Sequence, residues 1–328
     1  MKKCLLTMIS LIMVLSPALV GCASSSAAAA DFPGNNITVI VPFRAGGSID
    51  IMIRNLVPYW ERELGVTMVV ENYEGAFGQV GTTLFYNKPA DGYTILATTQ
   101  PYLSSRIIVG NTPFTIEDFD LINFQQFDPT CITVLSSSPY QTMGDLVAAI
   151  RANPRRIRAG TIAGGASHIL LELLKEAMSL DFRVVTYNSG SEYRTALLGG
   201  HVELIGSSAQ GDVALGDQAR LLALAGDTHL SAWPNSPLFS EALPGVDIPS
   251  LGSGRIVALR KEVRQNYPER FKKLLETYEA AFNHPDHIAR LKAAGELETS
   301  SIKGNAASNE MNRTLHEVAF RYRELLDN

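Results

Sequence analysis

Short apolar runs alternate with longer amphipathic stretches along most of the chain. The run Ile-Thr-Val-Ile-Val at residues 37–41 is short and β-branched, which predicts a strand. Over residues 49–64 the apolar side chains recur at positions 49, 52, 53, 56, 60 and 64, the spacing of one helix face. We expect further strands at 67–71 and 93–98, with a helix at 78–87 between them. This order predicts a mostly parallel sheet with helices on its faces.

A second series of the same kind begins at Cys131. We expect strands at 131–135, 157–161, 182–186, 202–206 and 221–225, separated by helices at 143–153, 168–180 and 192–198. From residue 237 to 254 the chain is rich in Pro, Gly and Ser, which indicates a loop region. After it, the pattern predicts a strand at 255–259 and helices at 268–283, 285–294 and 306–326. Two α/β series followed by C-terminal helices that pack back on the first series predict two domains. Residues 32–130 and 238–328 together form domain 1, and residues 131–237 form domain 2.

The N-terminus predicts a secretory signal. Lys2 and Lys3 precede a short apolar stretch at residues 5–15, which is too short for a comfortable membrane span. The sequence Leu19-Val20-Gly21-Cys22 is similar to a bacterial lipoprotein box, so we expect residues 1–21 to be removed and Cys22 to carry lipid. Residues 22–31 would then be a Ser/Ala tether. The alternative is an ordinary signal cleaved after the alanine run at 27–30.

Composition and charge restrict the function classes. Hydrophobic residues make up 46% of the 328-residue chain and charged residues 19%, which is typical of a globular protein. The formal charge is −5, and it becomes −7 when Lys2 and Lys3 leave with the signal. Nucleic acid is therefore excluded as the main partner, because phosphate binding needs a dense basic surface. Of the three cysteines only Cys131 would remain free, so no intrachain disulfide is expected.

Two Gly-rich turns are the first candidates for chemistry. One joins a strand to a helix through Phe43, Arg44, Ala45, Gly46, Gly47 and Ser48, and the other through Thr161, Ala163, Gly164, Gly165, Ala166, Ser167 and His168. Glycines let several backbone N–H groups converge, and a helix N-terminus adds free donors and partial positive charge. We expect the two turns to hold two ends of one small dianion. The alternative for each turn is a tight capped connection without a ligand.

Two further turns carry hydroxyl side chains. The strand-to-helix turn with Tyr187, Ser189 and Gly190 can hydrogen-bond carboxylate oxygens, although its serines can equally cap the helix. Ser207 follows another predicted strand and is a further candidate. The second Gly-rich turn is not G-x-G-x-x-G and has no P-loop lysine, which argues against a nucleotide.

Catalytic signatures are scarce. The chain has no G-x-S-x-G nucleophile turn and no H-E-x-x-H motif, so we expect neither an enzyme nor a metal or other cofactor. The one enzyme alternative is a serine hydrolase that uses Ser207 or Ser208 with His168 or His201. A turnover assay on esters would test that alternative.

Several blocks together resemble the solute receptors of tripartite tricarboxylate transporters, often called the Bug family. The resemblance covers most of the mature chain and is carried by the order and spacing of the blocks at 37–50, 69–78, 90–94, 154–168, 185–187 and 196–203. It implies an α/β, two-domain fold of the periplasmic-binding-protein-like type 2, in which each lobe is a mostly parallel sheet flanked by helices, with a cleft between them. The implied function is an extracytoplasmic receptor, a monomer that delivers a small carboxylate to the large and small membrane subunits of a transporter.

The resemblance also assigns ligand contacts to the two Gly-rich turns, with the turn at 187–190 and Ser207 as further contributors. It implies a protein that is exported, held at the membrane by lipid, and faces the periplasm or cell exterior. Asp50 is expected to brace the first turn, because a second negative charge would repel an anionic ligand. A sensory lipoprotein that binds the same ligand is the alternative to a transport receptor.

Two positions depart from the family pattern. Arg44 stands where the family has a small residue, and a guanidinium there could hold a carboxylate in a bidentate pair or point to solvent. Gly254 stands where the family has a Trp, which predicts the loss of a large wall residue and an altered pocket. The sequence does not identify the acid.

Overall fold

The computed structural model describes residues 32–187 and 189–326. The predicted signal at 1–21, the predicted lipidation site Cys22 and the whole predicted tether at 22–31 lie outside these residues, and they remain expectations. No helix in the described part of the chain has the length and apolar content to cross a membrane.

Nine strands in the described residues form one continuous hydrogen-bonded sheet. They are β1 (Ile37–Val41), β2 (Met68–Asn72), β3 (Thr94–Gln100), β4 (Phe119–Leu135), β5 (Arg158–Ile162), β6 (Arg183–Tyr187), β7 (Leu204–Ser208), β8 (Ala219–Ala225) and β9 (Gly252–Arg260). Their order is β2-β1-β3-β9-β4-β7-β5-β6, with β8 also paired to β4. We call β2, β1, β3, β9 and the start of β4 the first half-sheet, and the end of β4 with β7, β8, β5 and β6 the second half-sheet.

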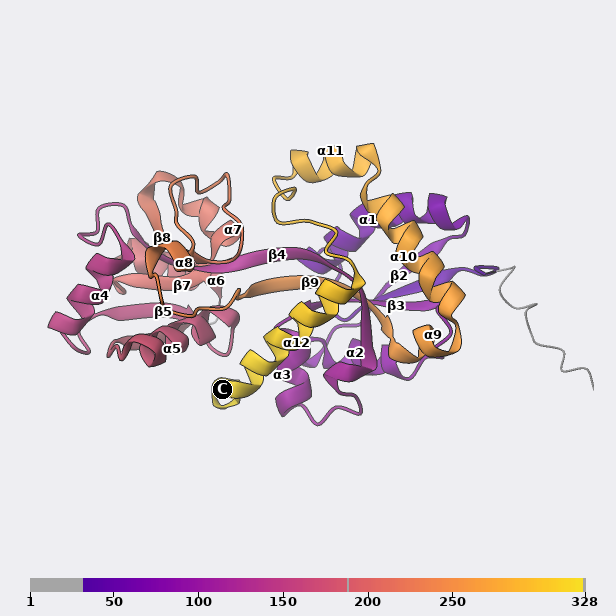
Figure 1. Ribbon diagram of the computed structural model, residues 1–328, viewed down its shortest axis with the longest axis horizontal. Helices are drawn as coiled ribbons and strands as arrows, with labels where there is room; N and C mark the ends of the chain where they lie inside the picture. Colours follow the sequence, from indigo (N-terminus) through magenta and orange to yellow (C-terminus); the bar gives the residue numbers. More distant parts are fainter. Residues whose placement is uncertain (1–31, 188, 327–328) are drawn as a thin grey trace, which may run out of the picture. The chain divides into compact units, whose positions relative to one another are not determined.

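Each half-sheet is mixed. Strands β1, β2 and β3 are parallel, as are β5, β6 and β7, which agrees with the predicted strand–helix alternation. The two parallel sets are joined through antiparallel pairs made by β4 and β9. Figure 1 shows β4 and β9 running side by side, and β4 pairs with β9 over Phe119–Pro129 and with β8 over Thr130–Leu135. The sequence predicted only the last five residues of this 17-residue strand.

Twelve α-helices are assigned within the described residues. They are α1 (Ser48–Leu64), α2 (Gln79–Tyr86), α3 (Tyr102–Val109), α4 (Met143–Ala152), α5 (Ala166–Met178), α6 (Gly190–Leu198), α7 (Ala209–Asp212), α8 (Phe239–Ala242), α9 (Lys261–Asn266), α10 (Pro268–Phe282), α11 (Pro285–Ala293) and α12 (Asn305–Arg321). The 3-10 turns are η1 (Ala76–Gly78), η2 (Ile116–Asp118), η3 (Val213–Gln218) and η4 (Arg323–Leu325). All six apolar positions that predicted α1 are buried, so its helical spacing is confirmed.

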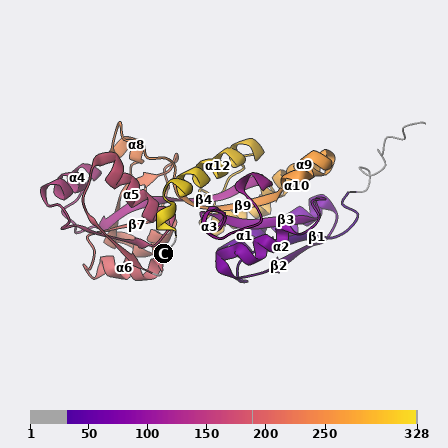
Figure 2. The same ribbon diagram turned by 90° about the horizontal axis from the view of Figure 1, so that it is seen from below.

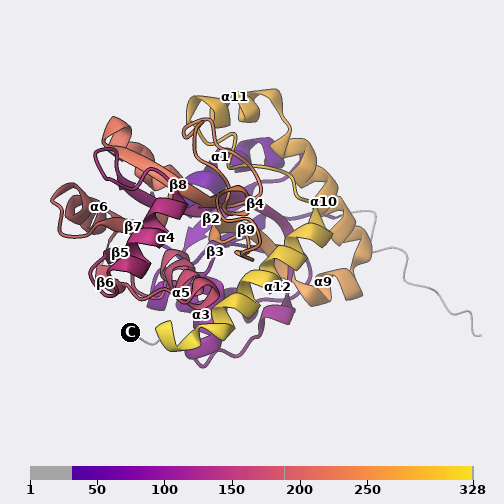
Figure 3. The same ribbon diagram turned by 60° about the vertical axis from the view of Figure 1, so that its left-hand side comes forward.

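The C-terminal helices pack on the shared strands. Figure 2 shows α9, α10 and α12 along the same side of β4 and β9, and each of the three contacts β4. Figure 3 shows the end of α12 beside α3 and α5. There Arg321 and Tyr322 both donate hydrogen bonds to Glu176 of α5. The predicted domain boundaries at 130, 131, 237 and 238 remain a proposal.

The parallel pairing decides where the loops meet. Parallel strands end at the same edge of a sheet, so the loops after β1, β2 and β3 are neighbours at one edge of the first half-sheet. By the same reasoning the loops after β5, β6 and β7 are neighbours at one edge of the second half-sheet. Every ligand contact predicted from the sequence lies at one of these two sets of strand ends, in the loop that follows or in the first turn of the next helix.

Candidate functional site

The first Gly-rich loop connects β1 to α1, and its conformation is stabilised by the side chain of Asp50. Gly46 has a φ of +75°, which places its N–H toward Asp50, and this N–H donates to Oδ2 of Asp50 over 2.8 Å. Asn72 at the end of β2 donates to the carbonyl oxygen of Phe43 and to Oδ1 of Asp50, both over 3.0 Å. The expected bracing role of Asp50 is confirmed by these contacts.

Asp50 is buried but remains the ionised partner of this network. Burial by itself raises the pKa of a carboxyl group, but the hydrogen bonds from Gly46, Asn72 and Arg54 outweigh it and the pKa of Asp50 is lowered. The ion pair with Arg54 has a distance of 2.8 Å. Gly46 donates from the loop backbone itself, and Asn72 links Asp50 to the carbonyl oxygen of Phe43, so Asp50 braces the loop.

The second Gly-rich loop connects β5 to α5 and is held by His168. Gly164 has a φ of +66°, and its N–H donates to Nδ1 of His168 over 3.1 Å. Burial lowers the pKa of His168, assisted by Lys175 and opposed by Glu172, which favours the neutral imidazole whose Nδ1 can accept this bond. The hydroxyl groups of Thr161 and Ser167 lie 2.8 Å apart in a hydrogen bond.

The two loops share one construction. In each, a glycine with positive φ donates its N–H to the side chain four residues later. The next residue, Gly47 or Gly165, is the N-cap of the helix in an extended conformation, with ψ of 166° or 167°. Neither helix has a side-chain cap, whereas α4 and α6 are capped by Thr142 and Ser189. The first N–H groups of α1 and α5 are therefore directed at whatever lies before the helix, which suits an anion.

The loop after β6 is organised differently. Ser189 caps α6, and its hydroxyl oxygen accepts a hydrogen bond from the N–H of Glu192 over 3.4 Å. Tyr187 ends β6 and is half-buried, and Gly190 is the first residue of the helix. This loop therefore resembles the capped-turn alternative more closely than either Gly-rich loop does.

Ser207 lies in a buried polar cluster. Its side chain is 1% exposed and its hydroxyl donates to Asp212, which also accepts from Thr133 over 2.6 Å and from Arg194 over 2.8 Å. We therefore leave Ser207 out of the proposed site. The other partners of this hydroxyl are Cys131 and Thr133, each at 3.4 Å, and within the described residues no histidine hydrogen-bonds to Ser207 as a serine hydrolase would require.

Arg44 extends into solvent from the first loop. Arg44, Ala45, Gly46 and Ser48 are all exposed, and no hydrogen bond or ion pair is formed by the Arg44 guanidinium within the part of the chain that the structure describes. The second loop, in contrast, is mostly half-buried. A free guanidinium beside the N–H groups of α1 adds positive charge at the position where we expect a carboxylate.

The expectation of a lost wall at Gly254 needs correction. Gly254 lies within β9, and a Cβ atom built there would come within 2.0 Å of Cζ of Phe124. The ring of Phe124 already occupies the space over Gly254 and is fully buried, with Phe127 at a ring-centroid distance of 6.1 Å. The glycine therefore accommodates a core phenylalanine instead of leaving a gap.

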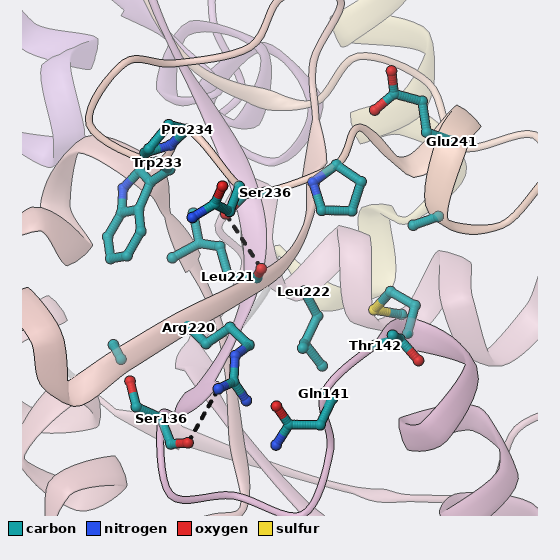
Figure 4. A pocket seen from close by; sticks show the side chains of 15 residues that line it. Ser136, Gln141, Thr142, Arg220, Leu221, Leu222, Trp233, Pro234, Ser236 and Glu241 are labelled. Atoms are coloured by element: carbon teal, nitrogen blue, oxygen red, sulfur yellow. Dashed lines mark hydrogen bonds between the residues drawn. The ribbon is translucent and has the colours of Figure 1, made fainter.

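The pocket in Figure 4 lies at the opposite edge of the second half-sheet from the predicted site residues. It has a volume of about 680 Å³ and is lined by Ser136, Arg220, Trp233 and neighbouring residues. Because β4 is antiparallel to β7 and pairs through Leu135 with the first residue of β8, this pocket lies near the amino ends of the parallel strands. None of the predicted ligand contacts lines it.

Three side chains that the sequence analysis did not single out gather beside the first loop. The ring of Tyr102 lies 6.2 Å from that of Phe43 and 6.0 Å from that of Phe77. The guanidinium of Arg106 lies 5.4 Å from the Phe77 ring centroid. They follow β2 and β3, whereas Phe43 follows β1, so only the parallel pairing of these strands shows that they are neighbours.

Comparison with known proteins identifies related chains. The family described as "Tripartite tricarboxylate transporter family receptor" matches residues 52–320. A Cupriavidus necator protein named "UPF0065 protein in gbd 5'region" is 27% identical over 273 residues, which is 80% of this chain and 79% of that protein. The crystal structure of a TctC solute-binding protein from Polaromonas has a TM-score of 0.79 and 24% identity, covering 90% of this chain and 99% of that one. MatC from Rhodopseudomonas palustris with bound malate has a TM-score of 0.62 and 19% identity, covering 90% and 100%.

Proposed function

Because this chain belongs to the tripartite tricarboxylate transporter receptor family, we propose that it captures a small organic carboxylate and delivers it to a membrane transporter. Export by the signal and anchoring through Cys22 are part of the proposal. The receptor would then act outside the cytoplasmic membrane, beside the large and small transporter subunits. The protein would work as a monomer and would need neither a metal nor another cofactor.

The shared construction of the two Gly-rich loops supports the proposal most directly. Gly46 and Gly164 each give up one N–H to an internal side chain, which fixes the loop and leaves the N-terminal N–H groups of α1 and α5 without a side-chain cap. A carboxylate can accept several such N–H bonds, and the partial positive charge of a helix N-terminus favours its negative charge. Two such loops provide one anchor for each end of a short acid.

A binding role accounts for these loops better than catalysis does. A receptor needs oriented donors and a protein that closes on the ligand, and it needs no nucleophile. The related protein MatC was solved with bound malate, a small dicarboxylate, which supports the ligand class. A sensory lipoprotein is the alternative, and measuring uptake of the acid in cells with and without this chain would separate the two roles.

A thermal-shift screen of the full chain against small carboxylates tests the proposal. A ligand raises the free energy of unfolding by RT ln(1 + [L]/Kd), which is about 2.7 kcal/mol at a hundredfold excess over Kd. Amides of the same acids are the matched controls, because they keep the shape and lose the charge. We expect one class of acid to stabilise the protein and its amides to have no effect. A folded sample that responds to no acid would contradict the proposed function.

A further inference from the structure

Phe77 combines an unfavourable backbone conformation with an exposed ring. Its φ and ψ are 51° and 40°, in the left-handed region that bulky residues seldom adopt, and Ala76 before it has a φ of 45°. Its side chain is 66% exposed, the highest exposure among the large apolar side chains of the described residues. Burial of the Phe77 ring therefore does not compensate for the free-energy cost of its backbone conformation. A residue held in this way more often serves a contact outside the fold.

Neighbouring side chains fix the ring of Phe77 in place. The ring is stacked on that of Tyr102 with an interplanar angle of 21°, and Arg106 lies over it. Tyr102 and Arg106 are one turn apart on α3, so they project from the same side of that helix. They cover one part of the Phe77 ring, and the rest remains open to solvent.

This cluster is continuous with the first Gly-rich loop. Phe43 opens the loop, and its ring is next to both Tyr102 and the backbone of Gly78, where an added Cβ would come within 3.0 Å of Cζ of Phe43. The row Phe43, Tyr102 and Phe77 therefore runs from the first Gly-rich loop toward Arg106. A ligand whose carboxylate bound at the first N–H groups of α1, those of Ser48 and Ile49, would extend its body along this row.

We infer that Phe77, Tyr102 and Arg106 form an aromatic platform that makes the receptor selective for aromatic carboxylates. The inference rests on the proposed function, because the first loop is taken to hold the carboxylate. A planar ring stacks on an exposed aromatic face with an attraction beyond simple area burial. The positive charge of the Arg106 guanidinium would attract the electron-rich ring of an aromatic ligand through a cation–π interaction. The buried Nε of Arg106 has no hydrogen-bond acceptor within the described residues. A short aliphatic acid would leave the platform uncovered.

Calorimetric titration of the full chain with matched acids tests this selectivity. Benzoate, 4-hydroxybenzoate and phenylacetate are the aromatic probes, and cyclohexanecarboxylate has the same size without a planar ring. Malate and adipate are the aliphatic probes. The main variant is Phe77→Gly, because glycine removes the ring and suits the positive φ, so the protein should fold at least as stably. Phe77→Ala and Tyr102→Leu are companion variants.

Phe320→Ala is the matched control. Phe320 on α12 is also an exposed phenylalanine, at 54%, and it also lies near an arginine, with Arg323 at 5.0 Å. We expect an aromatic acid to bind the unmodified chain at least about tenfold more tightly than cyclohexanecarboxylate, and Phe77→Gly to remove about tenfold of that affinity. Affinity for the other acids and the affinities of Phe320→Ala should not change.

Two results would overturn the inference alone. One is preferential binding of malate, adipate or cyclohexanecarboxylate by the unmodified chain, which would leave the proposed function standing. The other is an unchanged affinity of Phe77→Gly for the aromatic acid. Failure of the folded chain to bind any carboxylate is a different result, because it would contradict the proposed function itself and the inference with it.

Discussion

The backbone N–H of Gly164 donates a hydrogen bond to Nδ1 of His168, 3.1 Å away, and this bond fixes the loop in front of α5. Gly46 makes the equivalent bond to Asp50 in front of α1. Two different side chains thus perform one task, a neutral imidazole in the second half-sheet and a carboxylate in the first. The loops are therefore alike in backbone geometry and different in their response to pH.

Alanine should destabilise the protein at position 164 but not at position 165. At Gly164 the φ of +66° disfavours any side chain, and an added Cβ would lie 3.0 Å from the carbonyl oxygen of Leu325. Gly164→Ala should lower the free energy of unfolding by roughly 1–2 kcal/mol and weaken carboxylate binding. Gly165 has a φ of −80° and its nearest neighbour would be 3.5 Å away, so Gly165→Ala should fold normally. Urea unfolding and ligand titration of the pair check this, and equal behaviour would contradict the loop geometry.

Replacement of His168 should separate its acceptor role from its titration. His168→Asn keeps an acceptor near the position of Nδ1, whereas His168→Leu leaves the Gly164 N–H without one, at a cost of about 1–3 kcal/mol. We expect near-normal affinity for the asparagine variant and weaker binding for the leucine variant, measured by calorimetry at neutral pH. Equal losses in both variants would mean that packing, not hydrogen bonding, is what His168 supplies.

The lowered pKa of His168 also predicts a pH dependence. Burial lowers the pKa in the folded state, so this histidine contributes stability above its unfolded pKa of roughly 6.5, and the contribution is lost as the pH falls below that value. His287 and His316 are lowered in the same direction, so the informative quantity is the difference between the unmodified chain and His168→Asn. Between neutral pH and about pH 5 the unmodified chain should lose stability relative to His168→Asn, because only its unfolded state takes up a proton at residue 168 as the pH first falls. A constant difference would show that His168 does not titrate in this range.

The lowered pKa of Asp50 predicts a second loss of stability, at a lower pH than the one caused by His168. Its pKa is lowered in the fold, so its stabilising contribution is present above the unfolded value of about 3.8 and is lost as the pH falls through the lowered folded value. Asp50→Asn should cost about 1.5–3 kcal/mol near neutral pH, because hydrogen bonds to a charged group are replaced, and should flatten the acid limb of the stability curve.

Asp145→Asn is the matched control for Asp50. Asp145 also has a lowered pKa, since it accepts hydrogen bonds from Thr142 and Gln141 at the start of α4. It lies outside both Gly-rich loops, so its replacement should leave carboxylate affinity unchanged while Asp50→Asn weakens it. Thermal unfolding across the acid range and titration at neutral pH give both readouts. If both variants bind alike, Asp50 does not support the ligand loop.

The sequence was informative where local pattern decides the structure. The six apolar positions of α1 have helical spacing and all are buried, and both Gly-rich turns connect a strand to a helix as predicted. Most of β4 was missed because its polar residues are buried among distant partners. Asn123 donates to the carbonyl oxygen of Ser301, and Gln125 accepts from the hydroxyl of Tyr278. No local periodicity reveals a strand whose polar side chains are satisfied from more than 150 positions away.

The same limit applies to the candidate site. The Gly-rich loops are contiguous in sequence, so their residue types alone predicted an anion-binding arrangement. Phe77, Tyr102 and Arg106 follow two different strands, and only the order β2-β1-β3 brings them to Phe43. Gly254 illustrates the opposite error, because a missing side chain predicted a gap that Phe124, 130 positions earlier, already fills. Contacts between distant segments decided each of these cases.

The contact between Gly254 and Phe124 gives a final prediction. An alanine Cβ at 254 would come within 2.0 Å of the Phe124 ring, so Gly254→Ala should lower the free energy of unfolding by about 1–3 kcal/mol through overpacking. Phe124→Leu makes room for the added Cβ, so the double variant should lose less stability than the sum of the losses of the two single variants.

Gly144→Ala in α4 is the control, because its Cβ would have only an ordinary contact of 3.5 Å with Thr142 and alanine favours the helix. Urea unfolding gives all four values. Simple additivity of the two core variants would mean that Phe124 and Gly254 do not compete for the same space, and the expectation of an enlarged pocket would have to be reconsidered.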